Sequence, residues 1–229
     1  MKTQNDEIAI ILANRHYLYQ LLQHIFGNEP NLNMLEIATN DHTIDAIQLM
    51  ENGDIKFDFF VELFDKLRNA ILTDQEALLD KLKTEYTYLM IGPDKLPAPP
   101  WESVYRTKER LIFQESTLAV RRAYLKYQFL PANYPHEADD HIALELDFMA
   151  HLAKLTLESF EDNGIEEVKR LLADQKSFLD EHLLVWIDQF ADQIQNSKTH
   201  YFYPQIAVLT KQLVGIDADV IDELVSLLE

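Results

Sequence analysis

The chain has 229 residues, of which 47% are hydrophobic, 10% aromatic and 26% charged, the proportions of a folded globular protein. Its low content of glycine and proline and its lack of low-complexity tracts exclude disordered and collagen-like chains. This length suits either one domain or two closely packed helical subdomains, and we expect a single domain over residues 1–229.

The charge balance narrows the choice of partners. Aspartate and glutamate number 39 against 20 lysines and arginines, a formal net charge of −19. A field of this sign repels phosphate backbones and anionic lipid head groups, so we expect no nucleic-acid partner. It attracts basic peptides, although acidity can also serve solubility alone.

Other absences bear on chemistry and location. The sequence has no cysteine, which excludes disulfides, cysteine-ligated zinc, iron–sulfur clusters and thiol catalysis. Asp6 and Glu7 precede a short apolar run at 8–13, whereas a secretory signal needs a basic start and a longer apolar stretch. Because no run of about 18 apolar residues occurs either, we expect a cytoplasmic protein without stable membrane insertion.

Apolar residues recur at helical intervals in the first quarter of the chain. From Asn5 to Phe26 this spacing predicts an amphipathic helix that ends at Gly27. Shorter helices are expected at 31–38 and 43–50.

Helical spacing resumes at 57–67 and leads to a second helix start. Thr73 and Glu76 have the spacing of a capping box, in which each side chain satisfies a free backbone N–H of the other residue. The helix that begins there is expected to end at Gly92-Pro93. The following stretch, GPDKLPAPPW, holds four of the eight prolines and therefore predicts an extended, stiff loop.

The second half of the chain also reads as helical. A helix is expected at 115–128, and after an irregular stretch Asp139 or Asp140 is expected to cap a long helix that Asn163-Gly164 ends. Another helix follows at 166–195.

Two short helices are expected to close the chain. Pro204 suits the first turn of one, and Asp217 or Asp219 could cap the other over 220–228. No period-two strand and no fixed-period repeat is present, so the sequence predicts an all-α fold of a single compact multi-helix domain.

Several common active-site patterns are absent from the sequence. The five glycines stand far apart, which excludes a glycine-rich phosphate loop. No serine has the neighbouring glycines of a strained nucleophile elbow. Neither the Glu-x-x-His pair of di-iron bundles nor the His-Glu-x-x-His motif of zinc proteases occurs.

One arrangement of metal ligands remains open. His141 and Glu145 stand four residues apart, on one face of a helix, and Asp139, Asp140 or His136 could complete a ligand set. A metal-dependent helical enzyme that uses this region is therefore the alternative prediction for function. The competing interpretation is that the acids cap the helix and that His141 pairs with Glu145.

Residues 106–126 hold a local excess of positive charge. Their cations outnumber Glu109 and Glu115 and leave a net charge of +4; they are Arg106, Lys108, Arg110, Arg121, Arg122 and Lys126. Such a strip could serve as a binding surface. In a chain of −19 we expect it instead to pair with the acidic helices around it.

Two long segments carry a resemblance to a known family. They are EYTYLMIGPDKLPAPPWESVY at 85–105 and YPHEADDHIALELDFM at 134–149. Both resemble the paired motifs of the TorD/DmsD family of chaperones for molybdopterin-containing oxidoreductases, and the run at 97–105 is nearest to its DmsD-like branch. The motifs cover less than a fifth of the chain, and an aromatic run at 201–203 fits the same family. Met90 departs from the pattern, which often has phenylalanine there.

The resemblance implies an all-helical cytoplasmic chaperone that is not an enzyme and carries no cofactor. Such a chaperone binds the twin-arginine signal peptide of a molybdopterin oxidoreductase precursor, of the DMSO or TMAO reductase type used in anaerobic respiration. It delays Tat export until the molybdenum cofactor is inserted and the enzyme has folded. The identity of the client and the choice between monomer and dimer stay open.

A receptor for a twin-arginine peptide needs carboxylates that accept guanidinium forks and an apolar groove beside them. The two motifs offer both kinds of residue. We expect the peptide-binding residues to be Trp101, Glu102, Ser103, Tyr105, Tyr134, Pro135, Glu137, Asp139, Asp140 and His141.

Three roles are distributed over these residues in our hypothesis. The negative end of the site consists of Glu137, Asp139 and Asp140. His141 fixes one of these carboxylates or donates to a peptide carbonyl. The apolar part is lined by Trp101, Tyr105 and Tyr134, with Pro99 and Pro100 holding Trp101 in place.

Structural alternatives stand beside these roles. Trp101 could be a buried anchor between helices, and Glu102 a first-turn helix acid or a partner of the second motif. Asp139 and Asp140 cannot both cap the same helix, which leaves one of them for another partner. His141 could be a packing histidine.

Overall fold

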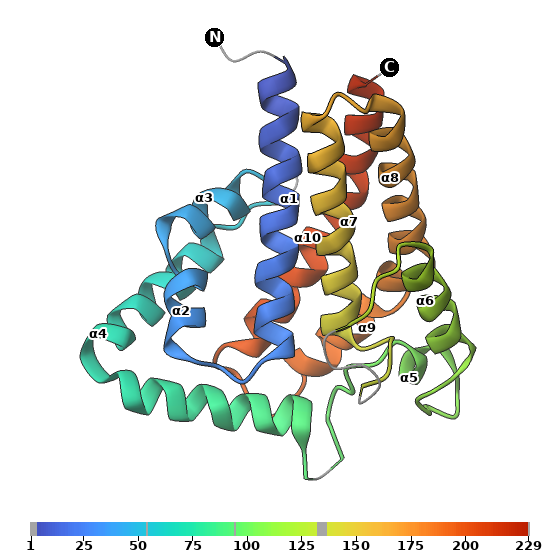
Figure 1. Ribbon diagram of the computed structural model, residues 1–229. Helices are drawn as coiled ribbons and strands as arrows, with labels where there is room; N and C mark the ends of the chain where they lie inside the picture. The colour runs from blue at the N-terminus through green and yellow to red at the C-terminus, as the bar shows by residue number, and fades with distance from the viewer. Residues whose placement is uncertain (1–3, 54, 94, 132–136, 229) are drawn as a thin grey trace. The chain divides into compact units, whose positions relative to one another are not determined.

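The computed structural model describes residues 4–53, 55–93, 95–131 and 137–228. Within these ranges there is no β-strand, only an isolated antiparallel bridge between Trp101 and His141. The helices are α1 (Gln4–Gly27), α2 (Leu32–Ala38), α3 (Asp41–Gln48), α4 (Asp58–Tyr86), α5 (Ser103–Arg106), α6 (Glu115–Lys126), α7 (Ile142–Glu161), α8 (Ile165–Phe178), α9 (Leu184–Gln195) and α10 (Tyr203–Leu227) (Figure 1). Two π-helical turns, η1 (Thr87–Ile91) and η2 (Leu179–Leu183), continue α4 and α8. The all-α prediction is confirmed.

The chain divides into two compact units. Unit 1 comprises residues 1–23, 101–186 and 214–229, and unit 2 comprises residues 24–100 and 187–213. Helices α1, α9 and α10 each contribute residues to both units. The single domain expected from the chain length stays a prediction.

Unit 1 is built around α7, whose apolar residues are buried on more than one side. Ile142, Leu146, Met149 and Leu152 are all fully or almost fully buried, which removes apolar surface from water and stabilises the unit. Helix α8 runs beside α7 (Figure 1). Helix α1 also contacts α7, through His16, whose Nδ1 lies 3.0 Å from the carbonyl oxygen of Ala150.

A buried ion pair joins three helices of unit 1. Arg15 of α1 contacts both carboxylate oxygens of Asp217 in α10, at 2.6 and 3.0 Å, and donates to Gln175 of α8 at 2.8 Å. Tyr19 donates to the same carboxylate at 2.7 Å. Burial of a charge is tolerated only with such pairing.

This pair explains why the expected end of the chain was wrong. Instead of two short helices, α10 runs without interruption from Tyr203 to Leu227, and Pro204 lies in its first turn as predicted. Asp217 does not cap a helix, because the residue lies in the middle of α10 and its carboxylate pairs with Arg15.

Unit 2 has an aromatic core. The ring of Tyr203 contacts those of Phe26, at a centroid distance of 6.3 Å, and Tyr86, at 5.7 Å, and Phe190 lies 5.9 Å from Phe26. Such tilted ring pairs add to the free energy gained from burial.

A buried carboxylate organises the start of α10 in unit 2. Glu85, near the end of α4, accepts hydrogen bonds from the backbone N–H groups of Tyr201, Phe202 and Tyr203 at 2.8 to 3.0 Å. Thr199 also donates to it through its hydroxyl. Free N–H groups at a helix start are thereby satisfied by an acid from a distant part of the sequence.

The expected break within residues 57–92 is present, with a different cap. Asp74 has a non-helical backbone (φ −155°, ψ 73°), and its carboxylate accepts from the N–H of Ala77 at 3.2 Å. The capping box of Thr73 and Glu76 was wrong, because the Thr73 hydroxyl donates back to the carbonyl of Asn69. Gly92, with φ 99°, ends the helical stretch as predicted.

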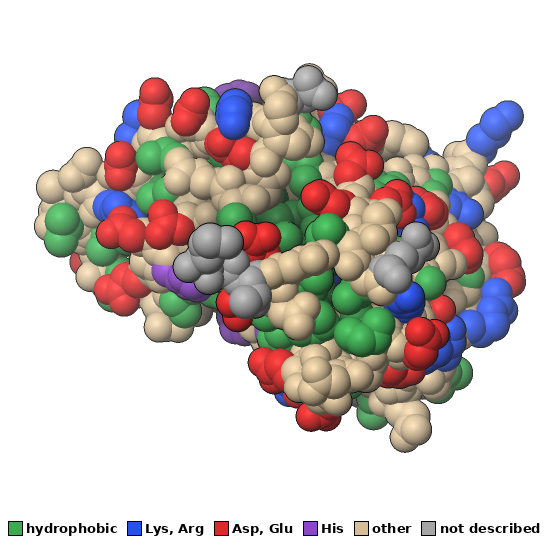
Figure 2. All heavy atoms as spheres, turned by 90° about the horizontal axis from the view of Figure 1, so that it is seen from above, with side chains coloured by type: hydrophobic (Ala, Val, Ile, Leu, Met, Phe, Trp, Pro, Cys, Tyr) green, Lys and Arg blue, Asp and Glu red, His purple; other side chains and the backbone are tan. Residues whose placement is uncertain are grey.

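The remaining helices follow the sequence periodicity. Asn31 and Asn40 cap α2 and α3 through their side chains. The predicted helix at 166–195 is present as α8, η2 and α9 in direct succession, and Asn163, with φ 59°, follows the end of α7. None of the helices within the described ranges combines the length and apolarity that a bilayer crossing requires. Acidic side chains are spread over the face seen in Figure 2, in line with the charge of −19.

Candidate functional site

The two motifs are joined directly in unit 1. The backbone N–H of Glu102 donates to the carbonyl of Asp140 at 2.9 Å, and the N–H of Ser103 donates to its carboxylate at 2.7 Å. The bridge between Trp101 and His141 continues this pairing. Asp140 therefore satisfies the first N–H groups of the short helix α5 and fixes residues 101–103 against 138–141.

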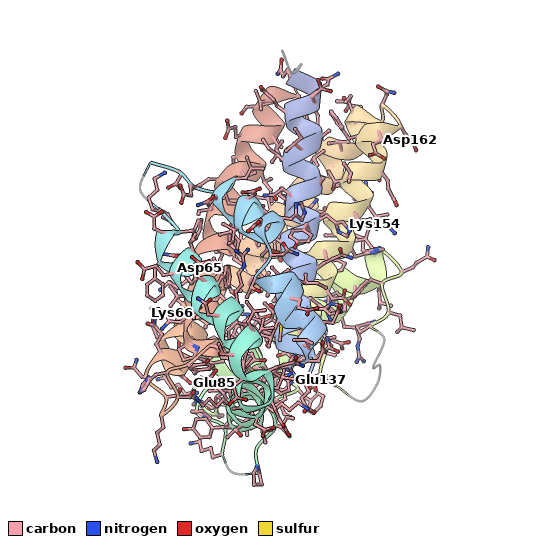
Figure 3. The ribbon with its side chains drawn as sticks, turned by 90° about the vertical axis from the view of Figure 1, so that its left-hand side faces the viewer. Asp65, Lys66, Glu85, Glu137, Lys154 and Asp162 are labelled. Atoms are coloured by element: carbon pink, nitrogen blue, oxygen red, sulfur yellow. The ribbon has the colours of Figure 1, made fainter. Side chains whose placement is uncertain are left out.

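Trp101 is half-buried and links to the second motif through its side chain. Its indole N–H donates to the Glu137 carboxylate at 2.8 Å, and its ring meets that of His141 edge to face, at 5.8 Å between centroids. The same oxygen of Glu137 accepts from the N–H of Ala138 at 3.0 Å. Trp101, Glu137 and His141 thus form one partly exposed surface, with Glu137 visible in Figure 3.

His141 caps α7. Its Nδ1 accepts a hydrogen bond from the N–H of Ala143 at 3.1 Å, so neither Asp139 nor Asp140 is the N-cap, and that prediction was wrong. Burial lowers the pKa of His141, against the opposing effect of the charges on Glu137 and Asp140. A neutral ring that accepts at Nδ1 carries its proton on Nε2, which can serve as a donor.

Asp139 is buried and paired with a cation. Its carboxylate accepts from Nε of Arg121 at 2.7 Å and lies 2.6 Å from Nη2, and its carbonyl accepts from the Tyr124 hydroxyl at 2.9 Å. Asp140 also has another partner, the N–H of Ser103, so both aspartates, and not only the one expected, are engaged away from the cap of α7. Their contact with a peptide stays a prediction.

Four of the six cations in the positive stretch at 106–126 form ion pairs with acids, three of which lie outside the stretch as expected. Besides Arg121, Arg122 contacts Glu115 at 2.7 Å, and Lys126 contacts Asp174 at 2.6 Å.

A group of buried carboxyls lies beneath the first motif. Glu102 and Glu145 are both fully buried. Glu102 contacts Nδ1 of His182 at 2.9 Å and Arg106 at 3.3 Å, and Glu145 accepts from the indole N–H of Trp186 at 3.2 Å. The burial of Glu102 agrees with the two structural roles considered for it, and its expected contact with a peptide stays a prediction.

Glu145 holds its proton more strongly than an ordinary glutamate. Burial raises the pKa of Glu145 well above its ordinary value, and the charges of Glu102 and Asp140 raise it further. The Glu145 carboxyl lies beside that of Glu102, which also favours its protonated form.

His182 was missed by sequence reasoning. It lies in η2, 80 positions from Glu102, and no local motif marks it. The signal that could have found it is chemical, since a buried glutamate needs a donor.

Tyr105 lies half-buried at the edge of this group. Its ring packs on that of Trp186 at 5.3 Å, and the Arg110 guanidinium lies 5.7 Å from the ring centre. Burial raises the pKa of Tyr105 above its ordinary value. Tyr134 and Pro135, also expected in the site, lie outside the described residues.

The metal alternative finds no support in the structure. Among the described residues, no group of three or more histidine, aspartate or glutamate side chains could hold a metal ion. His141 uses Nδ1 for the N–H of Ala143, and Glu145 binds Trp186, so the expected pairing of these two residues is replaced. His136, the other proposed ligand, lies outside the described ranges.

Comparison with known proteins identifies the family. The family model "Nitrate reductase delta subunit" matches residues 60–192. The chain is 33% identical over 192 residues to "Probable Tat proofreading chaperone DmsD" of Haemophilus influenzae, covering 83% of each chain. It is 26% identical over 212 residues to "Chaperone protein TorD" of Aliivibrio salmonicida, covering 93% of this chain and 96% of that one.

The fold has a solved counterpart. A protein from Archaeoglobus fulgidus named for redox enzyme maturation aligns with a TM-score of 0.52 at 23% identity, over 88% of this chain and 93% of that one. The all-helical fold, the paired motifs and these matches lead to one conclusion. The chain belongs to the TorD/DmsD family of chaperones and is not an enzyme.

Proposed function

We propose that this chaperone binds the twin-arginine signal peptide of a redox-enzyme precursor in the cytoplasm. Binding delays export until the molybdopterin cofactor is inserted and the enzyme has folded. The name of the DmsD relative, a probable Tat proofreading chaperone, supports a Tat-exported client. The chain's charge of −19 supports attraction of a basic peptide.

One observation carries the location of the site: Trp101, Glu137 and His141 meet on a partly exposed surface where the two motifs join. An indole face offers apolar contact, and a carboxylate beside it offers acceptors for a guanidinium group. Only one oxygen of Glu137 has a recorded hydrogen bond within the described residues, so the other can accept from an arginine without releasing Trp101.

The test is calorimetric titration with a twin-arginine signal peptide from a molybdoenzyme of the same organism. A second peptide carries lysine in place of both arginines, which keeps the charge and loses the planar fork. We expect saturable binding of the arginine peptide, about tenfold weaker binding of the lysine peptide, and affinity that falls with salt.

Two variants locate the site. Glu137→Gln is expected to weaken binding about tenfold, whereas Glu158→Gln, which removes the same charge from the exposed part of α7, is expected to change it less than twofold. Trp186→Phe leaves Trp101 as the only tryptophan, so its fluorescence reports the peptide directly. Equal affinities for the two glutamine variants would place the site elsewhere, and no binding of either peptide would refute the proposed function.

A further inference from the structure

Unit 2 carries two neighbouring grooves along the last turns of α4. One, of about 590 Å³, is lined by Lys83, Thr87 and Lys95; the other, of about 620 Å³, is lined by Lys81, Lys198 and Tyr201. Both grooves share Asp80, Thr84 and Tyr88. Spaced four residues apart, these three side chains form a ridge on one face of the helix that separates the grooves.

The ridge ends in an unusual backbone. Tyr88 lies in the π-helical turn η1, a type of turn that is frequent at functional sites. The turn leaves the Tyr88 side chain 37% exposed and that of Ile91 64% exposed. Tyr201, across the second groove, is 38% exposed. Two tyrosine rings are therefore available for contact.

The grooves are positive in an acidic unit. Among the described residues of unit 2, lysine and arginine number eight and aspartate and glutamate 14. Half of those cations line the grooves, against only two of the acids, Asp80 and Glu85. Glu85 is buried, and its oxygens accept hydrogen bonds from backbone N–H groups and Thr199. It therefore contributes little repulsion toward an anion at the surface.

The lysines are accessible. Lys95 and Lys198 are exposed and form no ion pair with any described residue. Lys83 makes an exposed pair with Glu29 at 3.1 Å, and Lys81 lies 5.6 Å from the ring centre of Tyr201. Exposed contacts of this kind exchange readily, since each is worth little in water.

The geometry selects among anionic ligands. A compact phosphate is favoured by converging backbone N–H groups at a helix start, but Glu85 already occupies those of α10. Lysines spread over two grooves beside exposed tyrosines instead match charges that are spread along an extended chain.

We propose that these grooves bind an acidic, extended segment of a partner polypeptide. Their charge has the wrong sign for an arginine pair, so the surface is distinct from the signal-peptide site proposed in unit 1. It would give the chaperone a second contact, and two linked contacts on one client raise the overall affinity above that of either contact alone.

The test uses a fluorescein-labelled peptide of alternating glutamate and tyrosine, with a glutamine–tyrosine peptide as its uncharged control. Fluorescence anisotropy at neutral pH is expected to show binding of the first peptide alone, weakened by salt. The double variant K95Q/K198Q is expected to lose at least about fivefold in affinity. K66Q, on the same helix α4 but outside the grooves (Figure 3), is expected to lose less than twofold.

Binding of the twin-arginine peptide by K95Q/K198Q separates this proposal from the proposed function, because that binding is expected to be unchanged. The single variants K95Q and K198Q repeat the comparison if the double variant melts early. The proposal is overturned if the acidic peptide does not bind or if K66Q weakens it equally. Inorganic phosphate should not displace the acidic peptide more than chloride does at the same ionic strength. If phosphate displaces the peptide and chloride does not, the grooves bind a compact anion and the proposal is overturned.

Discussion

Replacing Glu145 by glutamine tests the buried carboxyl pair. Glutamine keeps the size of the side chain, can accept from Trp186 and can donate to Glu102, as the protonated acid does. It also removes the carboxyl whose pKa is raised in the folded protein. We therefore expect Glu145→Gln to fold and to gain stability relative to the wild type as the pH rises.

The sign and size follow from linkage. The pKa of Glu145 is raised in the folded protein, so the unfolded chain releases this proton first, above the ordinary value of 4.5. Above that pH the wild type loses up to about 1.4 kcal/mol of stability per pH unit from this group, until the folded carboxyl also ionises. Glutamine does not titrate, so the difference in stability between variant and wild type rises with pH.

Urea unfolding followed by circular dichroism between pH 5 and 8 measures this difference. Subtraction of the wild type cancels other titrating groups, including His141, whose lowered pKa makes stability fall as the pH decreases below about 6.5. Glu158→Gln, on the exposed side of α7, is the matched control and should change the free energy of unfolding by less than about 1 kcal/mol throughout this pH range. A flat or falling difference for Glu145→Gln would show that burial does not hold the proton on Glu145.

Three further changes test the framework. Arg15→Met should lower the free energy of chemical unfolding by about 3–5 kcal/mol, because Asp217 stays buried without its cation. The double variant with Asp217→Leu should lose less than the sum of the two single losses. Asp140→Ala should cost about 1–3 kcal/mol, measured the same way, since a buried N–H loses its acceptor. Glu85→Ala should lower the melting temperature through the freed N–H groups at the start of α10; an unchanged melting temperature would contradict the capping role.

Periodicity predicted the helices because it reflects local burial. Helix α1, the long helix α7 and the stretch at 166–195 lie where the apolar spacing placed them. Gly92 and Asn163 also mark helix ends with positive φ, a local requirement that the sequence displays.

Caps and acids were harder to predict because their partners are remote. Asp217 pairs with Arg15, 202 positions away, so its local pattern wrongly indicated a helix start. The Asp140 carboxylate accepts a hydrogen bond from the N–H of Ser103, and His141 caps α7 instead. His182, with no motif around it, is specified only by the need of Glu102 for a partner. The spacing of residues along the sequence does not indicate which distant residues will be in contact.

The three acids of the second motif differ in how readily they could bind an arginine of a signal peptide. A peptide arginine that binds Asp139 must displace Arg121, so it exchanges one arginine–carboxylate pair for another and gains little free energy. Binding to Asp140 would free the buried N–H of Ser103, at a net cost. Glu137 requires neither exchange, because one of its oxygens already holds Trp101 while the other can accept an arginine. If the peptide binds at the joined motifs, Glu137 should therefore contribute more to its affinity than either aspartate.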